Sequence, residues 1–159
     1  RMMTTPPTRT RGGFTFVELL VAMTIMGILA GLAIPNITTI ILRARAVEVS
    51  ADLEVVAIAA RSYNADLHSW PSEAAAGNIP GELAPFLPAG FSFDHDGYQL
   101  DYENWNLPGG LPGDPSTRTL IGVSVVAADA ALGNAVLEHL GPAVIMSVGN
   151  THTVIIDRN

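Results

Sequence analysis

The hydrophobic positions of this chain begin with one long, almost uninterrupted run. From Phe14 to Leu42 nearly every residue is apolar, and the polar members are Glu18, Asn36 and a few threonines. A helix needs roughly 20 predominantly apolar residues to cross a membrane, and this run is longer than that. The run therefore predicts a membrane-spanning helix that carries a single carboxylate near its start.

Beyond Leu42 the pattern becomes that of an amphipathic helix. Apolar or small residues recur at spacings of three to five, and charged residues fall mostly between them. A continuous helix from Thr15 to Asp66 would be roughly 78 Å long at about 1.5 Å per residue, so its outer half is expected to pack on another part of the chain. The predicted buried stripe comprises Ile37, Ile40, Ala44, Val47, Ala51, Val55, Ile58, Ser62 and Leu67.

Residues 69–159 show the patterns of a small sheet with one short helix. Residues 69–90 are interrupted by proline and glycine, with one helical turn predicted over 82–87. Further on, a segment with alternating apolar and polar residues is followed by β-branched runs, the last two of which are joined by Gly149 and Asn150, which suits a tight hairpin. The predicted elements are strands at 98–105, 119–126, 144–148 and 151–156, and a helix over 129–140.

These elements predict an α+β fold. A long N-terminal α-helix, transmembrane in its first half, packs with its outer half on the apolar face of a small antiparallel β-sheet head. The predicted organisation is a leader at 1–13, a membrane helix at 14–42, its amphipathic continuation at 43–68 and a globular α+β head at 69–159.

Charge and composition narrow the possible functions. The chain has eight basic residues, all arginine, against fifteen acidic ones, for a net charge of −7. Such a balance argues against nucleic-acid binding, which needs a basic face. The chain has no cysteine, so disulfides, thiol nucleophiles and cysteine zinc sites are excluded. No phosphate-binding loop or nucleophile elbow is present, so the sequence predicts a protein that is not an enzyme.

Glu18 needs a partner, because a carboxylate at the centre of a bilayer costs about 2.5 to 3.5 kcal/mol or more. The small residues Gly12 and Gly13 precede the apolar run, whereas in an ordinary secretory signal they follow it. Cleavage after Gly13 would keep the helix and create a cationic α-amino group at Phe14, about one helical turn from Glu18. Two alternatives remain: a carboxylate stabilised by the helix N-terminus alone, and conventional cleavage that leaves a domain beginning at Ile34.

Residues 9 to about 45 resemble the class III signal and N-terminal helix of type IV pilins and type II secretion pseudopilins. The resemblance is carried by Gly13, Phe14, Glu18 in the segment TFVELL, and Pro35. It implies a pilin-like fold, cleavage after Gly13 and N-methylation of Phe14 by a prepilin peptidase. It also implies that Glu18 neutralises the N-terminal amine of a neighbouring subunit during filament assembly, and that Pro35 marks a weak segment of the helix.

The resemblance implies a structural filament subunit. The absence of cysteine differs from many type IV pilins and favours a type II secretion pseudopilin in a periplasmic pseudopilus. A type IV pilus or competence pilin is the first alternative, and a membrane-anchored binding module that does not polymerise is the second. The expected partners are copies of this chain or other pilin-like subunits, a prepilin peptidase, an inner-membrane assembly platform, and membrane lipid before assembly.

The same interpretation predicts the location of the chain. Arg1, Arg9 and Arg11 precede the apolar run, which by the positive-inside rule keeps the N-terminus cytoplasmic. The protein is thus expected in the bacterial inner membrane, as a single-pass chain with a periplasmic head, and then in a periplasmic or cell-surface filament.

A metal site is one further possibility. Asp94, Asp96 and Asp101 crowd one loop and strand, and carboxylate oxygens at this density are candidates for calcium, which the resemblance also implies for the major pseudopilins. The spacing matches no EF-hand loop, so a solvated acidic loop is the alternative. The four histidines show no ligand spacing and are expected at the surface or partly packed, and Trp70 and Trp105 are expected to anchor the core or loops.

Overall fold

The computed structural model describes residues 13–158, apart from the side chains of residues 32–36. The chain consists of two compact units, residues 1–39 and residues 40–159. The leader predicted at 1–13, with Arg1, Arg9 and Arg11, lies outside the described residues except for Gly13. Pro35 belongs to helix α1 by its backbone, but its side chain is outside the described part.

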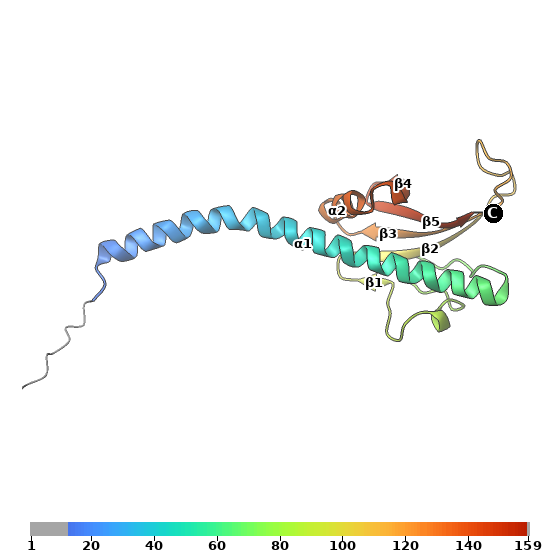
Figure 1. Ribbon diagram of the computed structural model, residues 1–159, viewed down its shortest axis with the longest axis horizontal. Helices are drawn as coiled ribbons and strands as arrows, with labels where there is room; N and C mark the ends of the chain where they lie inside the picture. Colours follow the sequence, from blue (N-terminus) through green and yellow to red (C-terminus); the bar gives the residue numbers. More distant parts are fainter. Residues whose placement is uncertain (1–12, 159) are drawn as a thin grey trace, which may run out of the picture. The chain divides into compact units, whose positions relative to one another are not determined.

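Helix α1 (Phe16–Leu67) is the long N-terminal helix that the sequence predicts (Figure 1). Its observed ends agree with the predicted ends at Thr15 and Asp66. It is followed by a single turn of 3₁₀-helix, Ala84–Phe86, within the segment where the sequence predicts a helical turn.

The head contains a five-stranded sheet and one short helix. The strand order is β1-β2-β3-β5-β4, and every neighbouring pair is antiparallel. The bounds are β1 (Asp94–His95), β2 (Tyr98–Asn106), β3 (Thr119–Ala127), α2 (Ala130–Leu140), a 3₁₀ turn (Gly141–Ala143), β4 (Val144–Val148) and β5 (Thr151–Arg158). The α+β fold with a small antiparallel sheet is therefore confirmed.

Local chemistry explains where these elements begin and end. The side chain of Asp129 caps α2 by accepting the backbone N–H of Leu132 at 2.8 Å, which satisfies one of the free donors of the first turn. The hairpin between β4 and β5 turns at Gly149, whose φ of 60° suits a residue without a Cβ. Strand β1 was not predicted, because two residues are too few to show an alternating pattern.

The core of the head lies between the sheet and the part of α1 that follows Ile40. Figure 1 shows the strands alongside this part of the helix. Tyr98, Leu100 and Tyr102 alternate along β2 toward the core, and Val125 and Val123 of β3 are the register partners of Leu100 and Tyr102. The core is completed by side chains from the connecting segments, Leu83 and Phe93.

The prediction of which face of α1 is buried was wrong. The predicted stripe is solvent-exposed except for Val55, which is half-buried; Val47 and Ile58, for example, are 52% and 54% exposed. Both faces of the helix carry apolar residues at helical spacing, so spacing alone does not distinguish the face that packs on the sheet. The buried face comprises Ala46, Val49, Leu53, Val56, Ala59, Ala60 and Tyr63.

Candidate assembly surface

The start of α1 is fixed by a side-chain cap. The Thr15 hydroxyl oxygen accepts the backbone N–H of Glu18 at 3.2 Å, and the Thr15 carbonyl accepts the N–H of Leu19 at 3.2 Å. The sequence Thr-Phe-Val-Glu has the spacing of a capping box, in which a hydroxyl residue precedes a glutamate by three positions. Glu18 is thereby placed in the first helical turn, where the positive end of the helix favours a carboxylate.

Glu18 is exposed and available to a partner. Within residues 13–158 its carboxylate makes no hydrogen bond or ion pair. Phe14 lies just before the helix and is 78% exposed, and no atom lies within 4 Å of the position that a side chain on Gly13 would occupy. The structure thus presents the three residues of the sequence motif, Gly13, Phe14 and Glu18, in one accessible segment.

The first part of α1 is apolar on every side. Large apolar residues from Phe16 to Leu29 are exposed at consecutive positions as well as at helical spacing. A helix that is hydrophobic all round is stable only when something covers it, such as lipid or other helices. Over the described residues, no helix meets the length and hydropathy that membrane crossing requires. The exposed residues are Phe16, Val17, Leu19, Leu20, Val21, Met23, Ile25, Met26, Ile28 and Leu29.

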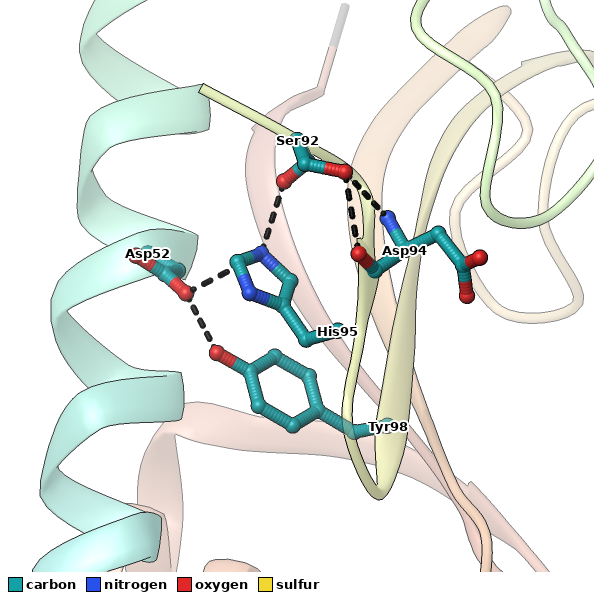
Figure 2. A network of polar contacts seen from close by, with 5 residues as sticks. All are labelled: Asp52, Ser92, Asp94, His95 and Tyr98. Atoms are coloured by element: carbon teal, nitrogen blue, oxygen red, sulfur yellow. Dashed lines mark hydrogen bonds and ion pairs between the residues drawn. The ribbon is translucent and has the colours of Figure 1, made fainter. Parts of the chain in front are cut away.

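A polar network joins α1 to the hairpin of β1 and β2 (Figure 2). The Tyr98 hydroxyl donates a hydrogen bond to the Asp52 carboxylate at 2.5 Å, and His95 stacks on Tyr98 with ring centroids 4.6 Å apart. Nε2 of His95 lies 2.7 Å from the backbone oxygen of Ser92 and 3.5 Å from the Asp52 carboxylate. Burial raises the pKa of Tyr98 well above its usual range, and the hydrogen bond to Asp52 adds to the effect.

An ion pair lies beside this network. The guanidinium of Arg45 is 3.6 Å from the Asp96 carboxylate, at the turn between β1 and β2. The hairpin is therefore attached to α1 by polar contacts at two of its residues, Asp52 and Arg45. Sequence analysis missed this function of His95, because the partners are more than 40 positions apart in the chain and no local pattern connects them.

The calcium candidates are not gathered around one point. Asp94 accepts a hydrogen bond from Gln99 at 3.0 Å, Asp96 pairs with Arg45, and Asp101 lies on β2. Within residues 13–158, no group of three or more histidine, cysteine, aspartate or glutamate side chains is arranged to hold a metal ion. Calcium binding stays a prediction of the sequence.

Asp101 is instead part of an acidic region of the sheet. Burial raises the pKa of its carboxyl to about 6, with further contributions from the carboxylates of Glu103 and Glu73. Burial also raises the pKa of Glu103, although the Ser124 hydroxyl donates a hydrogen bond to its carboxylate at 2.9 Å and opposes the shift. Charge on this part of the sheet is therefore unfavourable at neutral pH.

Replacing Asp101 by asparagine is expected to stabilise the head at pH 7. The folded-state pKa of about 6 exceeds the ordinary value of 3.8, so between these two pH values the folded chain binds a proton that the unfolded chain has lost. The stability that this proton provides falls as pH rises from 3.8 to about 6. Above that range the full cost of the charged, partly buried carboxylate is present. The gain in the free energy of unfolding should be about 1 kcal/mol after allowance for solvent screening.

Thermal unfolding of the two proteins across pH would measure this effect. The stabilisation by Asp101→Asn should disappear as pH falls well below 3.8, where both states are protonated. Glu138→Gln removes the same charge from an exposed position of α2 and is the matched control. A gain that does not depend on pH would contradict the explanation.

The predicted positions of the histidines and tryptophans are correct for some residues and wrong for others. His152 is fully buried, which corrects its assignment to the surface or a partly packed position; its Nδ1 lies 2.8 Å from the Ser147 hydroxyl. Its strand, β5, lies between β3 and β4, and Gly133 of α2 faces its Nε2, an arrangement that the sequence pattern around a lone histidine does not reveal. Trp70 packs against the core, in agreement with its predicted role as an anchor.

Comparison with known proteins agrees with these features. Residues 8–34 match the prokaryotic N-terminal methylation motif. Over 102 residues the chain is 28% identical to the type II secretion system core protein G of Pseudomonas aeruginosa, a match that covers 63% of this chain and 72% of that protein. No solved structure matches the chain.

The motif match contains the segment from Gly13 to Glu18, and the fold joins a long N-terminal helix to a small antiparallel sheet, as expected for a pilin. Proteins of this kind are structural subunits, so the chain is not an enzyme. On these findings the chain is similar to pilin-like proteins, the group that comprises type IV pilins and type II secretion pseudopilins.

Proposed function

We propose that this chain is a type II secretion pseudopilin, which assembles through α1 into a periplasmic filament. The observation that carries the proposal is Glu18, a carboxylate in the first turn of a helix whose first part, from Phe16 to Leu29, is apolar and exposed on every side. The similarity to core protein G supports a secretion role over a pilus role. Its partners are copies of itself or other pilin-like subunits, a prepilin peptidase and an inner-membrane assembly platform.

Processing is the first step of the proposed mechanism. A prepilin peptidase cleaves after Gly13 and methylates the new amino group of Phe14. Residues 1–13 are then the leader, 14–42 the segment that lies in the inner membrane before assembly and in the filament core afterwards, 43–68 the continuation of the helix, and 69–159 the periplasmic head. The helix contains a weak segment with Gly27, Gly31 and Pro35. This segment lets the helix change its bend between the membrane and the filament.

Register is the second step. The cationic amine of Phe14 in one subunit pairs with the Glu18 carboxylate of its neighbour as the helices leave the bilayer. A charge pair removed from water is favourable only when both partners are present, because an unpaired charge in an apolar setting is costly. Subunits out of register leave Glu18 unpaired, so the pair selects one spacing.

The intact mass and N-terminal sequence of the protein from membranes would test this proposal. In cells that contain a prepilin peptidase, the mature chain is expected to begin at N-methylated Phe14. In cells that lack the peptidase, the residues before Phe14 should remain. A chain that keeps Gly13 in peptidase-containing cells, or that begins at Ile34, would contradict the proposal.

A further inference from the structure

A groove lies at the β4 and β5 side of the sheet. It has a volume of about 590 Å³. We call it the sheet groove, and its lining includes Trp105, Leu120, Ile145, Met146, Ile155 and Arg158. The groove is mostly apolar, and Arg158 is an exposed cation at its border.

Strand register shows which face of the sheet forms the groove. Trp105 of β2 is opposite Leu120 of β3, and Leu120 is opposite Arg158 of β5, so the three side chains form one row across the sheet. Their neighbour Ile121 is fully buried in the core. Because successive side chains of a strand point to opposite faces, the row points away from the core. The head alone therefore leaves Trp105 and Leu120 of this row only half-buried.

The adjoining edge of the sheet is also uncovered. Within the described residues β4 pairs only with β5, and its sequence VIMSV contains no charged residue. Ile145 is 67% exposed. Edge strands of soluble proteins are usually protected by charges or proline, and apolar patches that lack this protection mark interaction sites.

A second apolar surface of the head lies on α1. Ala44, Val47, Ala51 and Ile58 are exposed along one face of α1, and we call them the outer stripe. Their spacing is that of an amphipathic helix that binds in a groove. Exposed charges of both signs border this stripe, among them Glu48, Glu54 and Arg61, and Arg158 at the groove lies near enough to Asp114 to lower its pKa. The stripe is thus a convex apolar surface with charges of both signs at its border, and the groove is a concave apolar one that also carries both signs, in Asp157 and Arg158.

We propose that the sheet groove of one subunit receives the outer stripe of α1 from a neighbouring copy, with Arg158 facing Glu54. This inference rests on the proposed function, because a filament brings identical copies together in a repeating order. Two different surfaces of one chain make a head-to-tail contact, which can propagate, whereas pairing of two β4 edges would close into a dimer. This contact between heads acts together with the charge pair at Glu18, which fixes the spacing of neighbouring subunits.

Cysteine cross-linking in assembled filaments tests the contact. The chain has no cysteine, so introduced thiols react alone. Full-length Ile58→Cys and Met146→Cys chains are co-expressed in cells that contain the assembly machinery, and sheared filaments are treated with a short bismaleimide. A covalent dimer is expected only when both variants are present. Leu137→Cys, on α2, replaces Met146→Cys in the matched control and should give no dimer.

The outcomes separate the contact from the function. Filaments without the Ile58–Met146 dimer would overturn the contact and leave the proposed function intact. Dimers between two Met146→Cys chains would also overturn it, in favour of edge pairing. If the unsubstituted chain forms no filaments in the same cells, the proposed function fails, and the contact fails with it.

A charge exchange provides a second test that needs no cysteine. Arg158→Glu is expected to lower filament yield several-fold, and Glu54→Arg in the same chain should restore it. The thermal unfolding temperature of each variant shows whether the head still folds. A double variant with the same low yield as Arg158→Glu, at an unchanged unfolding temperature, would overturn the pairing of these two residues.

Discussion

Replacing Glu18 by alanine is expected to abolish filament assembly while the chain still inserts into the membrane and folds its head. Removing one partner of a charge pair that is shielded from water costs about 3 to 5 kcal/mol, because the other charge is left uncompensated. A loss of this size at each subunit contact lowers the association constant by a factor of about 100 or more. The effect should be multiplied along the filament, since every subunit makes the same contact.

The measurement is the amount of protein in the sheared filament fraction relative to the membrane fraction. Glu18→Gln keeps the size of the side chain and should fail like alanine, which separates the loss of charge from the loss of packing. Glu138→Ala, at an exposed position of α2, is the matched control and should assemble normally. Filaments of normal yield from Glu18→Ala would show that register does not depend on this carboxylate.

The fold of the head needs a separate check in these variants. Glu18 belongs to the compact unit of residues 1–39, whereas the sheet belongs to that of residues 40–159. We therefore expect Glu18→Ala to leave the unfolding temperature of the head unchanged. A fall in that temperature together with a loss of filaments would assign the defect to folding.

The sequence predicted the elements of this fold well, because each has a strong local pattern. Helix α1 is long and periodic, β2 alternates cleanly, and the Gly149 turn joins two β-branched runs. The face of α1 that packs on the sheet could not be derived in the same way. Two apolar stripes compete on that helix, and only the tertiary structure determines which of them packs on the sheet.

For the candidate site, too, the sequence predicted what local spacing shows and missed contacts between distant residues. Gly13, Phe14 and Glu18 lie within one short segment, so their association was evident from spacing alone. The contacts of Asp52 with Tyr98 and His95 join residues far apart in the chain and depend on how the hairpin lies on α1. The three calcium candidates show the opposite case, since closeness in sequence did not bring them around one point.

Replacing Leu100 by alanine is expected to destabilise the head by about 2 to 5 kcal/mol. Leu100 is fully buried in the middle of β2, where its register partner is Val125 and its neighbours include the buried face of α1. Truncation removes apolar contacts with both layers. It also leaves a cavity that close-packed surroundings fill only in part.

Unfolding of the full-length proteins in detergent, followed by tryptophan fluorescence, measures this loss. The unfolding temperature should fall by at least about 5 °C, given the usual relation between free energy and unfolding temperature for small domains. Leu137→Ala makes the same truncation at an exposed position of α2 and should cost much less. If the two variants lost equal stability, the layer between α1 and the sheet would not be the main source of stability in the head. If Leu100→Ala alone unfolds at lower temperature, its filaments should fail only near that temperature, because the register pair at Glu18 is untouched.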